Sequence, residues 1–157
     1  MTAATPNTVK ARNRTIHATD AAIAAVILSA ALQFFQPGIA NLLWMLGALA
    51  AAVGTVALRK QINGADLPGA ELDEYELQRH LEAREDGFKT GLVLSIAFFL
   101  ISGLVALACQ LWVELDATEV ALFFAKLLTV QILWVPFMIA RSLAGKINRD
   151  ELITRQG

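Results

Sequence analysis

Four apolar stretches, at residues 16–35, 39–58, 90–113 and 120–140, approach the length of a membrane-spanning helix. Such a helix needs about 20 apolar residues to cross the roughly 30 Å of hydrocarbon in a bilayer. Of the 157 residues, 56% are hydrophobic and 17% are charged, and the mean hydropathy is +0.54. This composition is too apolar for an ordinary soluble domain of this size. The sequence therefore predicts an all-α integral membrane protein with four spans.

Short links divide the four predicted spans into two pairs. The first link is the tight reversal Gln36-Pro37-Gly38, and the second covers residues 114–119. Two helices joined so closely form a transmembrane hairpin. We expect the two hairpins to pack as one four-helix bundle that forms a single domain over residues 1–157, with the charged segment 59–89 between the hairpins.

The Lys and Arg residues lie on one side of these spans. All 13 except Lys126 fall before the first span, between the second and third spans, or after the fourth. Positive residues in short flanks are retained on the cytoplasmic side of a membrane. The pattern predicts a bacterial-type cytoplasmic (inner) membrane protein with both chain ends and segment 59–89 in the cytoplasm and both short links outside.

Residues 71–86, within the segment between the hairpins, have the composition of an acidic helix. This part contains seven acidic and two basic residues, several of them spaced to pair along a helix. Its negative charge would hold it away from an anionic membrane surface. One interpretation is a solvated spacer helix that leads into the third span. The other is a docking element for a cytoplasmic partner protein, whose candidate docking residues are Asp73, Glu74, Glu76 and Arg79.

Lys126 lies inside the fourth apolar stretch. A charge near the centre of a membrane helix costs about 2.5 to 3.5 kcal/mol, so such a residue is a functional candidate. Counted from Val120, Lys126 lies about 9 Å below the outer boundary, and helical side chains lean toward the N-terminus, here the outer face. We expect its ammonium to extend toward that face, where Glu119 could meet it. Lys126 has two alternative roles. It could handle a substrate or ion, or it could form an ion pair between helices or between subunits.

Gln131 is the second candidate polar residue within the spans. It lies about 140° around the helix from Lys126, so the two side chains do not line one face. Amide side chains of this kind form hydrogen bonds between membrane helices. Gly87 and Gly91 form a G-x-x-x-G pattern that lets two helices approach closely, either within one chain or between copies.

Several classes of function are disfavoured by what the sequence lacks. It has no cofactor motif, no phosphate-binding loop and a single cysteine, Cys109, which excludes an intramolecular disulfide. A net charge of −1 argues against nucleic-acid binding. Small proton-coupled drug exporters are similar to this chain in size and span number, but they depend on a carboxylate buried in the first span. The nearest candidate in this chain, Asp20, lies at the entrance of that span.

These observations favour a non-enzymatic membrane protein without cofactor or metal. We expect an accessory, regulatory or immunity-type role, in which helix faces and the acidic segment bind a partner protein or further copies of the chain within the lipid bilayer. The alternative is a small homo-oligomeric transporter or channel that uses Lys126 and Gln131.

Overall fold

The computed structural model describes residues 6–62, 71–111 and 115–154. These ranges contain four long helices, which are α1 (Asn7–Leu32), α2 (Pro37–Lys60), α3 (Glu74–Leu111) and α4 (Ala117–Thr154). Each helix is long and apolar enough to cross a membrane. The all-helical class and the four candidate membrane-spanning helices are therefore confirmed.

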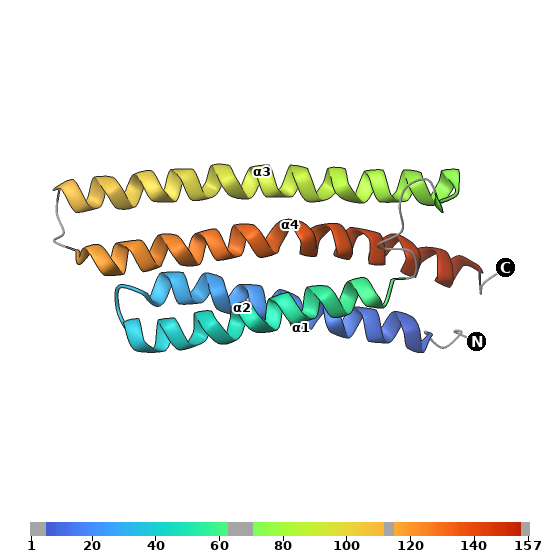
Figure 1. Ribbon diagram of the computed structural model, residues 1–157, viewed down its shortest axis with the longest axis horizontal. Coiled ribbons are helices and arrows are strands. Elements are labelled where there is room, and N and C mark those ends of the chain that lie inside the picture. Colours follow the sequence, from blue (N-terminus) through green and yellow to red (C-terminus); the bar gives the residue numbers. More distant parts are fainter. Residues whose placement is uncertain (1–5, 63–70, 112–114, 155–157) are drawn as a thin grey trace.

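The four helices lie side by side along the long axis of the molecule (Figure 1). The start of α1, the end of α2, the start of α3 and the end of α4 lie at one end, which we call the terminal end. The α1–α2 turn and the link between α3 and α4 lie at the other, which we call the hairpin end. The helices therefore alternate in direction, as two consecutive hairpins require.

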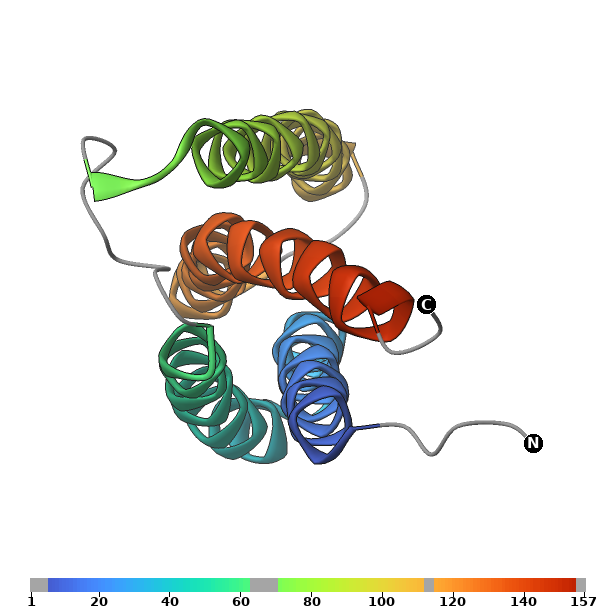
Figure 2. The same cartoon turned by 90° about the vertical axis from the view of Figure 1, so that its right-hand side faces the viewer.

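Helix α4 lies in the middle of the arrangement. Viewed along the helices, α3 lies on one side of α4 and the α1–α2 pair lies on the other (Figure 2). Helix α4 packs against each of the other three, whereas α3 packs mainly against α4. The two hairpins thus form three layers, with α3, α4 and the α1–α2 pair stacked in that order.

Three of the helices have termini that their sequences explain. Pro37 begins α2, where a missing backbone N–H costs nothing. The Asp116 carboxylate accepts hydrogen bonds from the backbone N–H groups of Thr118, at 2.7 Å, and Glu119, at 3.3 Å, and so caps α4. Asp73 caps α3 by accepting one from the backbone N–H of Glu76 at 2.6 Å.

The helices extend beyond the predicted spans at the terminal end. Helices α3 and α4 contain 38 residues each, which corresponds to roughly 57 Å and exceeds the hydrocarbon thickness of a bilayer. Helix α1 ends at Leu32, three residues before the predicted end of the first span. The predicted end of the third span at Val113, and Glu114 in the second link, lie outside the described residues.

Glycines bring α3 close to α4. A Cβ atom added at Gly91 would lie 2.7 Å from Cγ2 of Val135, and one added at Gly87 would overlap the side chain of Ile139. Both glycines are buried, and both contacting residues belong to α4. The G-x-x-x-G pattern is thus used within the chain, in the contact between α3 and α4.

Replacing Gly87 by alanine tests this contact. We expect Gly87→Ala to lower the free energy of unfolding by about 1 to 3 kcal/mol, because the added methyl group must displace Ile139. Gly103, in the same helix, has no atom within 4 Å of an added Cβ. Gly103→Ala should therefore leave stability unchanged or raise it by up to about 1 kcal/mol. Equal effects of the two substitutions in a detergent-unfolding titration would contradict this packing.

Candidate functional site

Lys126 lies where α1, α2 and α4 meet, and its side chain has no exposed surface. Its Nζ donates hydrogen bonds to Oε1 of Gln33, at the end of α1, and to Oδ1 of Asn41, at 2.9 Å, in the first turns of α2. The ammonium also lies 5.7 Å from the centre of the Trp44 ring, within the range of a cation–π interaction. One side chain of α4 therefore holds both helices of the first hairpin.

These contacts differ from those expected from the sequence. Lys126 makes no ion pair with Glu119, although both residues are within the described part of the chain. The ammonium instead reaches Gln33 and Asn41, which flank the α1–α2 turn. The side chain extends toward the hairpin end, as expected, but it is enclosed by protein rather than exposed at the surface.

The cation lacks a carboxylate partner among the described residues, because its two hydrogen-bond acceptors are neutral amides. Trp44 is fixed beside it, since its Nε1 donates a hydrogen bond to Oγ1 of Thr129 at 3.1 Å. Gln33 is also fully buried, and its Nε2 has no hydrogen-bond partner. A buried charge with neutral partners is expensive in a membrane and marks a functional candidate.

Gln131 belongs to a different contact. Its Nε2 donates hydrogen bonds to Oγ of Ser95 at 2.8 Å and to the carbonyl oxygen of Gly91 at 3.3 Å, both in α3. Lys126 contacts the α1–α2 hairpin, so the two residues serve opposite sides of α4. This agrees with their predicted separation around the helix. The described structure does not bring these two candidate residues together.

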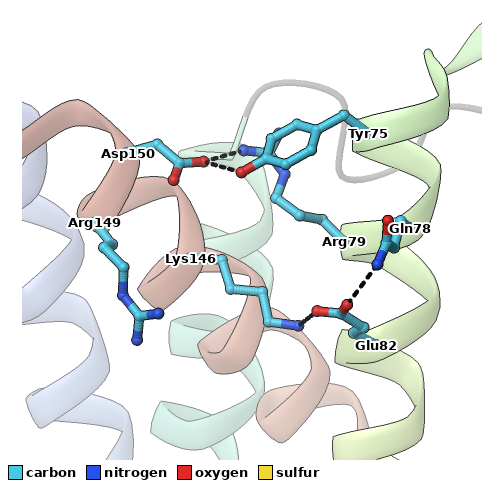
Figure 3. Close-up of a pocket in the computed structure, with 7 residues that line it drawn as sticks. All are labelled: Tyr75, Gln78, Arg79, Glu82, Lys146, Arg149 and Asp150. Carbon is cyan, nitrogen blue, oxygen red and sulfur yellow. Dashed lines mark hydrogen bonds and ion pairs between the residues drawn. The ribbon is translucent and has the colours of Figure 1, made fainter. Parts of the chain in front are cut away.

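A polar cluster joins α3 to α4 at the terminal end (Figure 3). Oδ2 of Asp150 accepts hydrogen bonds from Arg79 at 2.8 Å and from the Tyr75 hydroxyl at 3.3 Å. Lys146 donates to Oε2 of Glu82 at 2.6 Å. A pocket of about 190 Å³ lies among these side chains. Partly exposed ion pairs contribute little to stability, so these contacts fix the position of α3 against α4 more than they stabilise the fold.

The four predicted docking residues have different environments. Arg79 is bound to Asp150, and Asp73 caps its own helix. Glu74 and Glu76 make no hydrogen bond or ion pair through their side chains among the described residues. Segment 71–86 is therefore attached to α4 rather than free, and Glu74 and Glu76 remain available to a partner.

A second set of contacts, which the sequence did not predict, joins α1 to α4. Arg12 is 4% exposed and forms an ion pair with Glu151. Arg141 donates a hydrogen bond to Asp20 at 2.7 Å, so the carboxylate at the entrance of the first span is neutralised by α4. The paired residues are more than a hundred positions apart. Only their tertiary arrangement could reveal these pairs.

The chain has no match among protein-family models, curated proteins or solved structures. Within residues 6–62, 71–111 and 115–154, no three His, Cys, Asp or Glu side chains are grouped as a metal site requires. Function must therefore be inferred from the contacts and surfaces of the chain itself.

A double-mutant cycle measures the contact between Lys126 and Gln33. We expect Lys126→Met and Gln33→Leu to be coupled by about 1 kcal/mol or more in the free energy of unfolding, because either change removes a hydrogen bond from the other, buried side chain. The matched control combines Lys126→Met with Glu119→Gln, for which the coupling should be below about 0.5 kcal/mol. A larger coupling to Glu119 than to Gln33 would contradict the observed geometry.

Proposed function

We propose that this chain is an integral protein of a bacterial-type cytoplasmic membrane, in which the terminal end faces the cytoplasm. The four candidate spans and the clustering of Lys and Arg at that end support this orientation. The charged parts of α3 and α4 at the terminal end, with their ion pairs, then lie in water beyond the headgroups. Burial of such groups in hydrocarbon would cost several kcal/mol each.

Within that membrane, we propose a non-enzymatic accessory or regulatory role in which α3 binds a transmembrane helix of a partner protein. The exposure of α3 carries this proposal. Its most apolar 18-residue stretch has no buried residue, whereas between 22% and 39% of the corresponding stretches in the other helices is buried. Phe99 and Leu104 are 77% and 66% exposed. A helix with one neighbour in its own chain retains most of its surface for another helix.

Polar groups on the cytoplasmic part of α3 extend this proposed surface. Glu74 and Glu76 lie in the first turn of the helix and are not used in its attachment to α4. A partner with basic residues just inside the membrane would meet them while its transmembrane helix contacts α3.

Transport remains a second candidate because of Lys126. A fully buried ammonium with neutral partners is typical of a residue that handles an ion or substrate. A continuous polar route through Lys126 and Gln131 is less well supported, since the two contact opposite neighbours of α4. The transport alternative therefore depends on Lys126 alone.

Site-specific photo-crosslinking in native membranes tests the binding role. We expect a photoreactive residue at Phe99 to give a discrete protein adduct, because a partner helix would cover α3. The matched control is Met45 on α2, which is 68% exposed and which we expect to face lipid.

Two results would contradict the proposal. One is the absence of a protein adduct at Phe99, and the other is the same adducts in the same yield from Met45. Reversing Glu74 and Glu76 to lysine should reduce the Phe99 adduct without releasing the chain from the membrane, if these carboxylates contribute to docking.

A further inference from the structure

Lys126 is a buried cation that lacks a counterion within the described residues. Its ammonium donates hydrogen bonds to the amide oxygens of Gln33 and Asn41, which carry no net charge. Arg12, which is also buried, has the Glu151 carboxylate as its partner. Enclosing an unpaired ion in protein costs several kcal/mol even after the protein relaxes. The contact among α1, α2 and α4 therefore lacks one negative charge.

The same contact contains hydrogen-bond donors without acceptors. An ammonium carries three N–H groups, and a primary amide carries two. Lys126 donates to two acceptors, whereas Nε2 of Gln33, a fully buried side chain, has no hydrogen-bond partner. A buried donor that remains unpaired costs about 1 to 3 kcal/mol. The site thus lacks an acceptor as well as a negative charge.

The unpaired donors of Lys126 and Gln33 lie close enough to contact one acceptor. The oxygen and nitrogen atoms of an amide are about 2.2 Å apart, and Oε1 of Gln33 is hydrogen-bonded to Nζ of Lys126. Nε2 of Gln33 therefore lies within about 6 Å of that Nζ. An acceptor about 3 Å from each nitrogen can span this separation. The two donor groups can thus share a single ligand.

The helix termini beside Lys126 do not supply the missing charge. Gln33 lies at the C-terminal end of α1, which carries a partial negative charge, and Asn41 lies near the N-terminal end of α2, which carries a partial positive one. Both side chains contact the same ammonium, so the two partial charges oppose each other there. The negative charge must therefore come from outside the described residues.

We propose that Lys126 and Gln33 bind a small monovalent inorganic anion, such as chloride, where α1, α2 and α4 meet. The anion balances the single ammonium and accepts hydrogen bonds from Nζ of Lys126 and Nε2 of Gln33. Both side chains are enclosed by protein, which favours a small ion over one with an organic tail. A divalent ion would lose more hydration free energy in such a site. This proposal is independent of the partner proposed for α3.

Quenching of Trp44 fluorescence by bromide measures this site, because bromide is a close analogue of chloride and quenches tryptophan on contact. The Trp44 ring centre lies 5.7 Å from the ammonium, and the changes Trp112→Phe and Trp134→Phe leave Trp44 as the only tryptophan of the chain. The purified intact protein is titrated with bromide at constant ionic strength, with gluconate as the replacement anion. We expect saturable quenching that chloride reverses by competition. Quenching that rises linearly without saturation would overturn the proposal.

Two substitutions at the site, with a matched control, assign the bound anion to Lys126. Gln33→Glu places a carboxylate beside the ammonium, so the chain itself supplies the missing charge, and the saturable quenching should be lost. Lys126→Met removes the cation and should abolish this quenching as well. Gln110→Glu makes the same change at an exposed residue of α3 and should leave the quenching as it is. Because Gln33→Glu keeps Lys126, it carries the test alone if Lys126→Met does not fold.

Saturable quenching that survives in Gln33→Glu, or that is lost equally in Gln110→Glu, would contradict the site. Thermal unfolding gives a second measurement. Replacing chloride by gluconate at constant ionic strength should lower the Tm of the unsubstituted protein, because a bound ligand stabilises the folded state. The same replacement should leave the Tm of Gln33→Glu unchanged. An equal decrease in both proteins would assign the effect to a different part of the molecule and overturn the proposal.

Discussion

In the membrane that we propose for this chain, the central position of α4 depends on its polar side chains, because a polar group in an apolar environment needs a hydrogen-bond partner. Apolar contact by itself does not drive helices together in hydrocarbon, because lipid tails are equally apolar. Lys126 holds the α1–α2 hairpin through Gln33 and Asn41, while Gln131 holds α3 through Ser95. Helix α4 is therefore the element through which the two outer layers are joined.

The two sides of α4 are attached to different extents, and this difference supports the binding proposal. On the α1–α2 side, contacts run from the ion pair of Arg12 and Glu151 at the terminal end to Lys126 near the hairpin end. On the α3 side, the polar contacts end at Ser95, and the following apolar residues of α3 are largely exposed. The part of the chain that is least used internally is thus the part we assign to a partner.

The sequence was sufficient for the helices but not for their arrangement. Apolar length predicted four helices, and the 140° between Lys126 and Gln131 predicted that they serve different faces of α4. The partners of Lys126 could not be predicted, because Gln33 and Asn41 lie 93 and 85 residues away. Likewise, the acidity of segment 71–86 suggested a free surface, but Arg79 and Glu82 form ion pairs with residues of α4. These α4 residues lie beyond the predicted end of the fourth span, so the apolar pattern did not reveal that they belong to the same helix.

Cross-linking of cysteine pairs in native membranes, on a Cys109→Ser background, tests most directly whether α4 lies between α3 and the first hairpin. The structure predicts that a short bismaleimide joins Asn13→Cys to Asn148→Cys, and Asp86→Cys to Ser142→Cys, because each native pair is hydrogen-bonded. It also predicts little cross-linking of Asn13→Cys to Asp86→Cys, since these residues lie on α1 and α3. Efficient joining of that third pair, with weak joining of the Asp86 and Ser142 pair, would contradict the central position of α4.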